Sequence, residues 1–416
     1  MNTVYSLAIK HSEEVKIKAS ELAVAEARYR EALSSYYPQL ALFARSTQQS
    51  PSRNNTTNSL LTDLLLGRTP SLENRNTNSS NTSSFTRYDV GGLSLNWPLF
   101  TGLRSFNEGK AAREARDAAR FSEKRFRELL YLDLARLFYQ NLEYDKAILL
   151  FKDEERTLRF RINELARRLS LGRSRDGEVL NARAELLSVQ TDLKAQEHLR
   201  QSAREMLSFL IGQPADALKL KDAQVLPAKE DLNRYLETTP ARNDLEAARS
   251  LLKSKEMQTR AEKGGHLPRL DLQAEGYAYQ APSTGRDWRF TVAITLPLFE
   301  GGATHNRVRL AQEEVKTQQL EVKKLERLAD FETRLAYSAF VTAMARKALL
   351  DQAVRIARQA YAVQLRDYDL GAGTALEVFD ALRRFHSTRR NHLRAETELR
   401  LEHIQLQIAA GRTGNL

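Results

Sequence analysis

The sequence predicts a mainly helical protein with a small β part, in which two long antiparallel helical hairpins each follow a pair of strands and the whole arrangement is duplicated. Three observations predict this fold class. The ten prolines leave two long stretches free, one between Pro98 and Pro214 and one after Pro297, and proline breaks helix interiors. Runs that alternate apolar and polar residues precede both stretches. The junction sequence Pro-Leu-Phe-x-Gly opens each stretch.

Composition limits the function classes. The chain has 416 residues, a length typical of two or three domains, and a formal net charge of +11. Its 64 Lys and Arg are dispersed among 53 Asp and Glu, which favours solvated helix faces over a nucleic-acid patch. The chain has no cysteine, and no run of about 20 apolar residues predicts a transmembrane helix. The first residues contain no apolar signal core, so we expect either a protein that is not exported or a mature form.

The duplication is visible as a constant offset. The junction prolines Pro98 and Pro297 are 199 residues apart (297 − 98). The other landmarks with this offset are Leu171-Gly172 with Leu370-Gly371, Glu178-Val179 with Glu377-Val378, and Ala182 with Ala381. An insertion in a packed helical pair would rotate every later side chain off its face. The unbroken register therefore indicates two copies of one structural repeat.

The first repeat is expected over residues 1–213. It begins with a helix and continues as a β-hairpin over 37–97, whose strands flank a long loop at 50–86 that is rich in Asn, Ser and Thr. A helical hairpin then runs over 102–211, because its apolar residues recur at steps of three and four. A segment near 170–177 with two glycines and an aspartate predicts the turn at its tip.

The second repeat is expected over residues 240–416, after a linker at 214–239. It too begins with a helix. Its β-hairpin, over 267–297, alternates apolar and polar residues with a period of two. Its helical hairpin, over 301–411, turns at a tip near 369–375 that also contains two glycines.

The four predicted strands have the length and alternation of outer-membrane barrel strands. The alternative is an ordinary antiparallel sheet with one solvated face. Four strands are too few to close a barrel, and an open sheet leaves its edges unpaired. Oligomerisation would solve both problems.

These pieces together resemble the TolC family of outer-membrane efflux and secretion channel proteins. The residues that carry the resemblance are SSYYPQL at 34–40, the two Pro-Leu-Phe-x-Gly junctions, LGRSRDGEVLNAR at 171–183, LGAGTALEVFDA at 370–381, and an amphipathic helix through Gly411. The resemblance covers nearly the whole chain. It implies a homotrimer with a 12-stranded β-barrel in the Gram-negative outer membrane and a periplasmic α-barrel.

The resemblance also implies a function. It predicts the passive exit duct of a tripartite efflux or type I secretion system, with a periplasmic adaptor (membrane fusion) protein, an inner-membrane transporter and outer-membrane lipid as partners. The rival interpretations are a soluble coiled-coil scaffold or adaptor and a basic helical nucleic-acid binder, and neither explains duplicated strands. The seven His are scattered and no catalytic or metal motif occurs, so neither enzyme activity nor a cofactor is expected.

The strand–helix junctions are the first candidate functional positions. Pro98 and Pro297 are expected to end strand pairing, because proline lacks an N–H for the ladder. Gly102 and Gly301 are expected to permit the sharp turn into each long helix.

Two carboxylates after the second tip are candidates for an aperture. Glu377 and Asp380 are three residues apart, hence on one helix face. The resemblance places them at the periplasmic aperture, where three copies would form a six-acid constriction selective for cations. The residues alone favour a solvated pair three residues apart on the helix surface.

The resemblance suggests a latch at the tips. Tyr368 matches a tyrosine that bonds across to the neighbouring hairpin, and Glu178 matches its carboxylate partner. The gating arginine of the family would fall at Gly373, so Arg173 or Arg175 of the first tip would have to replace it. The residues that match an adaptor-docking motif, and that also read as plain turn residues, are Leu171, Gly172, Ser174, Leu370, Gly371 and Gly373.

Overall fold

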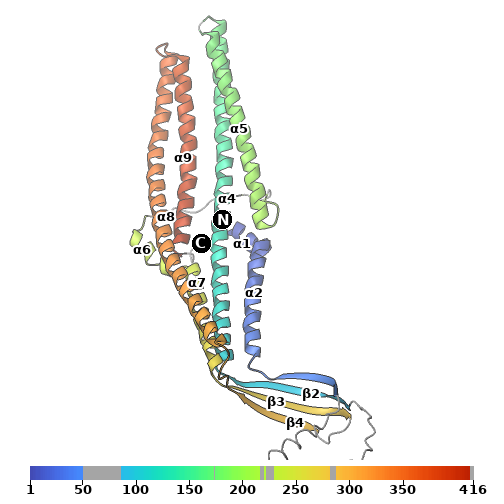
Figure 1. Cartoon of the computed structure of the whole chain (residues 1–416). Coiled ribbons are helices and arrows are strands. Elements are labelled where there is room, and N and C mark those ends of the chain that lie inside the picture. Colours follow the sequence, from blue (N-terminus) through green and yellow to red (C-terminus); the bar gives the residue numbers. More distant parts are fainter. Residues whose placement is uncertain (50–85, 173, 216–219, 222–228, 282–286, 413–416) are drawn as a thin grey trace, which may run out of the picture. The chain divides into compact units, whose positions relative to one another are not determined.

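A computed structural model gives the fold, and it confirms a mainly helical chain with a small antiparallel sheet (Figure 1). The structure describes residues 1–49, 86–172, 174–215, 220–221, 229–281 and 287–412. The predicted loop at 50–86, except for its last residue, lies outside them.

The helices and strands follow the predicted order. The helices are α1 (Asn2–His11), α2 (Glu13–Ser34), α4 (Arg104–Ser170), α5 (Asp176–Ile211), α6 (Leu232–Leu236), η1 (Thr239–Ala241), α7 (Asn243–Lys263), η2 (Gly264–His266), α8 (Ala303–Asp369) and α9 (Ala375–Ala409). The strands are β1 (Gln39–Gln49), β2 (Thr86–Thr101), β3 (Arg269–Ala281) and β4 (Trp288–Thr295).

The chain divides into two compact units that both take residues from both halves of the sequence. The helical unit consists of Met1–Tyr29, Lys110–Glu256 and Ala311–Leu416, and the sheet unit consists of Arg30–Gly109 and Met257–Leu310. The first residues of α4 and α8 are assigned to the sheet unit and their remaining residues to the helical unit.

The two longest helices have the same length. α4 and α8 each contain 67 residues, and both begin and end at positions 199 apart. Neither contains proline, and both are rich in strong helix formers. α5 runs back along α4, and α9 runs back along α8 (Figure 1). The helical unit is therefore built around two hairpins.

The backbone repeats the offset at its exceptional positions. Among the described residues, eight have a positive φ, and they form four pairs 199 residues apart: Gly102 with Gly301, Leu103 with Gly302, Gly172 with Gly371, and Gly212 with Gly411. The left-handed conformation is costly for residues with a Cβ. Seven of the eight are accordingly glycine, and Leu103 is the exception.

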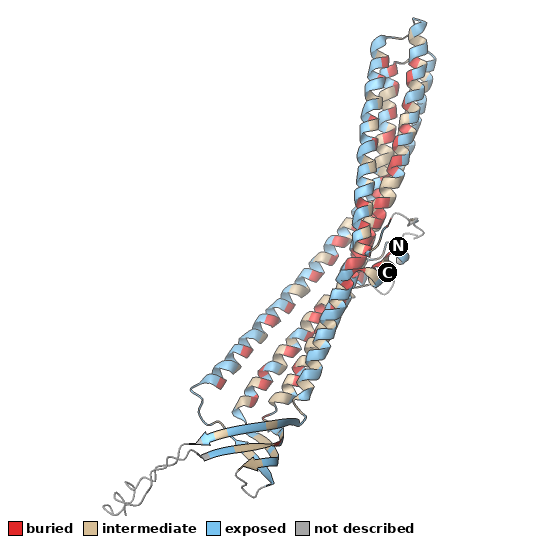
Figure 2. Cartoon of the chain, turned by 90° about the vertical axis from the view of Figure 1, so that its right-hand side faces the viewer, coloured by how far each residue is buried: buried red, intermediate tan, exposed pale blue. Residues whose placement is uncertain are grey.

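The cores of the two hairpins are stripes rather than a single centre. Figure 2 shows buried residues recurring along the inner faces of the helices. Leu158 and Leu165 of α4, with Val179 and Ala182 of α5, are at most 3% exposed. Each buried leucine contributes about 2 kcal/mol. A further cluster packs α1 against α4 and α5 through Val4, Ala8, Phe138, Leu207 and Ile211.

The sheet has four antiparallel strands in the order β1-β2-β3-β4, so one side of β1 and one side of β4 are unpaired within the described residues. One face is apolar and exposed, as Leu42 (83% exposed) and Ile294 (74%) illustrate. No helix within the described residues combines the length and apolar character needed to cross a membrane.

Candidate functional site at the hairpin tips

The two tips share a Leu-Gly pair directly after the outgoing helix. The leucine, Leu171 or Leu370, is about three-quarters exposed. The next residue, Gly172 or Gly371, has φ of 72° or 77°, the left-handed conformation that commonly ends helices. A Cβ added at either glycine would touch nothing within 4 Å. Backbone conformation, not crowding, therefore requires glycine here.

Arg168 connects the two tips, although the sequence analysis did not select it. Its Nη2 donates to Oδ1 of Asp369 over 3.0 Å, and its guanidinium carbon lies 4.4 Å from the centroid of the Tyr368 ring. Arg168 belongs to the last turns of α4, while Tyr368 and Asp369 end α8. We call these three residues the tip clasp. Each contact, being partly exposed, contributes about 0.5–1 kcal/mol.

No local motif predicts the clasp. Its residues are about 200 positions apart, and their contact depends on how the two hairpins are rotated. A usable signal does exist, because α4 and α8 are equally long and their final turns therefore reach the same level. Arg168, two residues before the end of α4, is the basic residue of that helix that comes nearest to the end facing Asp369 of α8.

The other residues of the predicted latch are placed differently. Glu178 accepts a hydrogen bond from Ser174 Oγ over 2.6 Å, and the described residues show no hydrogen bond between Glu178 and Tyr368. Arg175 is the N-cap residue of α5 without a side-chain capping bond. Arg173 lies outside the described residues. Within one chain, Tyr368 contacts Arg168, and the latch between Tyr368 and Glu178 stays a prediction.

The aperture candidates are engaged inside their own helix. Glu377 forms a capping box with Thr374: the Thr374 backbone N–H donates to Glu377 Oε2 over 2.8 Å, and the Glu377 N–H donates to Thr374 Oγ1 over 3.4 Å. The hydrogen bond from the Thr374 backbone is the main reason that the pKa of Glu377 is lowered. Asp380 pairs with Arg383 on the next turn. Glu377 is exposed and Asp380 is partly exposed, and each interacts within its own helix. Their place at an aperture stays a prediction.

The turn of the second tip also explains Gly373. Its N–H donates to the carbonyl of Asp367 over 3.2 Å, and an added Cβ would lie 3.3 Å from the Tyr368 nitrogen. A side chain at this position would make a tight contact with the backbone of Tyr368, which belongs to the clasp.

The tips carry opposite charge. Residues 167–178 contain four arginines and two acids, a net charge of +2, whereas the equivalent residues 366–377 contain one arginine and three acids, a net charge of −2. The ion pair between Arg168 and Asp369 joins these oppositely charged ends.

The two strand–helix junctions differ more than their sequences suggest. An added Cβ at Gly102 would lie 2.3 Å from the carbonyl oxygen of Gly264, whereas one at Gly301 would meet nothing within 4 Å. β4 ends at Thr295, before Pro297, as expected.

The expectation that Pro98 ends strand pairing is wrong. β2 continues to Thr101, with an irregularity between Pro98 and Phe100, and Pro98 is opposite Asp271 of β3. On the other side, pairing with β1 already stops at Asn96. Beyond Asn96, β2 is an edge strand on that side, where a missing N–H is tolerated.

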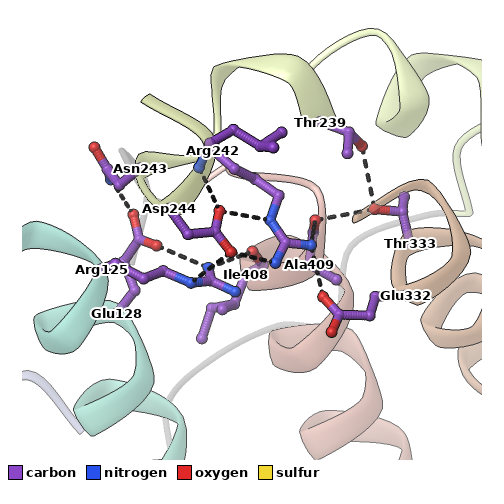
Figure 3. Close-up of polar contacts among 11 residues, drawn as sticks. Arg125, Glu128, Thr239, Arg242, Asn243, Asp244, Glu332, Thr333, Ile408 and Ala409 are labelled. Atoms are coloured by element: carbon purple, nitrogen blue, oxygen red, sulfur yellow. Dashed lines mark hydrogen bonds and ion pairs between the residues drawn. The ribbon is translucent and has the colours of Figure 1, made fainter. Parts of the chain in front are cut away.

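A buried charged network in the helical unit also escaped the sequence analysis (Figure 3). Arg242, 2% exposed, pairs with Asp244 and Glu332 and donates to the carbonyl of Ala409 at the end of α9. Burial raises the pKa of Asp244, but the hydrogen bond from Arg242 and the charges of Arg125 and Arg242 outweigh burial and leave that pKa lowered. A buried arginine without these partners would be strongly destabilising.

The network fixes the end of the second hairpin. Arg125 of α4 donates to the carbonyl of Ile408, so two arginines serve as cationic caps for the C-terminus of α9. Thr333 of α8 also donates to the Ala409 carbonyl over 2.9 Å. Helices α4, α8 and α9 are therefore tied together far from the tips in sequence.

Comparison with known proteins gives a consistent result. A family model described as outer membrane efflux protein matches residues 4–213 and 237–412. Protein CyaE of Bordetella pertussis is 24% identical over 354 residues, which cover 79% of this chain and 72% of CyaE. Outer membrane protein TolC of Vibrio cholerae is 23% identical over 296 residues, which cover 68% of this chain and 67% of TolC.

The fold has solved counterparts. The outer membrane protein VceC of Vibrio cholerae superposes with a TM-score of 0.83 at 19% identity, covering 99% of this chain and 95% of VceC. At this identity the likeness concerns the fold, and it confirms the architecture expected from the sequence.

Proposed function

The chain belongs to the outer membrane efflux protein family, and from this premise we propose that three copies close one conduit, joined to an inner-membrane transporter through a periplasmic adaptor. The proposed conduit is passive: its energy comes from the transporter. Family membership leaves no room for the soluble scaffold or the nucleic-acid binder considered from the sequence.

The four-stranded sheet is the observation that carries the proposal. It has an exposed apolar face and an unpaired side on each edge strand. An exposed apolar edge strand is a liability that proteins remove by pairing it. Pairing β4 of one copy with β1 of the next would close the sheet, with the apolar face toward lipid. Three copies would supply twelve strands, the number expected from the resemblance.

The tips are the proposed gate. The clasp between Arg168 and Asp369 would hold the two hairpins of one copy together. Arg175 of the first tip is then proposed to face the acidic second tip of a neighbouring copy, and Arg173, outside the described residues, stays the second candidate. Glu377 and Asp380 of that second tip are then proposed to line the aperture, with the charge of Asp380 reduced by Arg383.

The ends of the hairpins are the proposed adaptor-docking surface. The exposed Leu171 and Leu370, each followed by a left-handed glycine, present an apolar side chain on a fixed turn. The neighbouring docking candidates are Ser174 and Gly373. Two such turns per copy would offer six to an adaptor ring.

The oligomer tests the proposal directly. Extraction from membranes should require detergent, and the mass in detergent should equal three chains. Because the chain has no cysteine, disulfides between one engineered cysteine in β1 and one in β4 would report pairing between copies. Scanning such pairs should give a register that yields covalent trimers. A monomer that stays soluble without detergent, or conductance absent from planar bilayers, would contradict the proposal.

A further inference from the structure

We propose that the polar face of the sheet binds planar anions on a strip formed by Arg45, Phe43, Tyr277 and Arg289, and that this arginine–aromatic strip makes the sheet part of the conduit favour anions. The inference rests on the proposed function, because the strip lines a passage only if the polar face lies inside a closed barrel.

The strip is a continuous row of contacts across the sheet. The guanidinium of Arg45 lies 5.9 Å from the centroid of the Phe43 ring, and that ring meets Tyr277 edge to face with centroids 6.1 Å apart. On the other side of Tyr277, the guanidinium of Arg289 lies 5.8 Å from the ring centroid. Two cations thus flank two aromatic rings on strands β1, β3 and β4.

A glycine makes this row possible. Gly92 of β2 is opposite Phe43 on one side and opposite Tyr277 on the other. Since Gly92 has no side chain, the two rings approach each other over it. An added Cβ at Gly92 would lie 2.0 Å from the carbonyl oxygen of Gly276, so no other residue fits without moving the strands.

All four side chains point to the face opposite the apolar one. Side chains alternate along each strand, so Phe43 and Arg45 lie on the other face from Leu42. Glu275 is opposite Arg289, and the next pair along the ladder, Ala274 with Phe290, lies on the apolar face.

The charge of the strip is not balanced. Arg289, 58% exposed, is 3.7 Å from Glu275, which also accepts a hydrogen bond of 2.6 Å from the Tyr277 hydroxyl. Arg45 has no carboxylate partner among the described residues. Within the strip, one carboxylate therefore faces two guanidiniums, which leaves a local excess of one positive charge per copy.

This combination matches one ligand chemistry. A guanidinium binds a carboxylate or sulfonate with two parallel hydrogen bonds, and an aromatic face stacks on a planar ring. A passage lined by one sign of charge concentrates the opposite ion. The preferred cargo at this level is therefore an aromatic anion, in contrast to the cations that the acidic second tip would attract.

Ion selectivity in planar bilayers tests the charge. Under a KCl gradient, the Arg45→Gln/Arg289→Gln protein should show a K⁺/Cl⁻ permeability ratio about threefold or more above that of the unmodified protein. Arg45→Lys/Arg289→Lys should keep the original ratio. Arg87→Gln is the matched control, because Arg87 is opposite Gln48, lies on the other face and pairs with Asp89.

A blocker tests the stacking. Naphthalene-2-sulfonate should reduce the current of the unmodified protein, and Phe43→Leu should weaken this block about threefold or more while leaving the permeability ratio unchanged. Equal block of the unmodified and Phe43→Leu proteins would overturn the aromatic part of the proposal.

The outcomes separate this inference from the proposed function. Normal conductance with an unchanged permeability ratio in the double glutamine protein would overturn the strip and leave the conduit intact. No conductance from the unmodified protein would overturn the conduit itself. If the double variant fails to form the detergent-stable oligomer, the permeability ratio of the single variant Arg45→Gln decides the test. Replacing Arg45 breaks no ion pair in the described sheet.

Discussion

The two halves of the chain share a backbone but not its contacts. Gly102 and Gly301 have nearly the same φ, yet only Gly102 is pressed against another backbone segment. Both tips have a left-handed glycine after the outgoing helix, yet the first is basic and the second acidic. The left-handed backbone positions occur in both halves, at the places where the long helices begin and end. The side chains differ at the tips, where the two halves contact each other.

The largest expected difference between the halves lies at the junctions. Gly102→Ala should lower the free energy of unfolding by more than about 3 kcal/mol, because positive φ and a backbone clash add up. Gly301→Ala should cost only about 1 kcal/mol from conformation. Both tryptophans, Trp97 and Trp288, belong to the sheet unit, so their fluorescence during urea unfolding reports this comparison. Equal losses of unfolding free energy in Gly102→Ala and Gly301→Ala would show that the two junctions are equivalent.

The helix caps at the tips should differ next. Thr374→Ala removes the capping box and should destabilise the first turn of α9 by about 1 kcal/mol. Hydrogen exchange in this turn should therefore become about fivefold faster. Arg175→Ala is the matched change at the first tip, where the N-cap makes no side-chain bond, and should leave exchange at the start of α5 unchanged. Mass spectrometry of peptides from the first turns of α9 and α5 measures both exchange rates. Faster exchange at the start of α5 in Arg175→Ala would contradict the prediction.

The cap of α9 should also depend on pH. Because the pKa of Glu377 is lowered in the folded chain, its stabilisation is complete above the ordinary carboxyl pKa and is lost as pH falls through the folded value. After correction for intrinsic rates, exchange in the first turn of α9 should therefore rise in acid. Glu377→Gln, which has no titrating carboxyl group, should remove this dependence, whereas Thr374→Ala keeps the backbone N–H and should only reduce it. Exchange that is insensitive to acid would argue against the capping role of Glu377.

The clasp should have a smaller effect on stability but a visible one on gating. A double-mutant cycle with Arg168→Ala and Asp369→Ala should give a coupling energy of about 0.5–1 kcal/mol, because the pair is partly exposed. Each single change should raise the open probability in bilayers a few-fold. The exchange Arg168→Asp with Asp369→Arg should restore closure. Failure to restore it, with intact oligomers, would mean that the ion pair is not the gate contact.

Salt should give the smallest effect. Raising KCl from 0.1 to 1 M shortens the screening length from about 10 to 3 Å and weakens exposed pairs. Open probability should rise about twofold in the unmodified protein and stay nearly constant in Arg168→Ala. A similar rise in both proteins would assign the salt response to other charges.

Periodicity and proline spacing predicted the elements well, because long amphipathic helices and alternating strands are local patterns. Leu158 and Val179 are buried as their spacing indicated. The capping box was also readable, since Thr374 and Glu377 have the Thr-x-x-Glu signature, but these residues were interpreted only through the aperture.

What escaped prediction depends on neighbours that are distant in sequence. Arg168 meets Asp369 only because two separate hairpins face each other in one rotation. The pairing of Pro98 depends on where β1 stops, and the edge-to-face contact of Phe43 with Tyr277 depends on the strand register across Gly92. None of these relations has a local signature.

The equal length of α4 and α8 has an evolutionary consequence. Deleting seven residues from α4 alone would shorten it by about 10 Å and carry Arg168 out of reach of Asp369. The same deletion at the matching place in α8 would bring the partners level again. The length of the helical hairpins can therefore change only by paired events in both halves, so related chains of different length should differ by insertions or deletions at matching places of the two repeats.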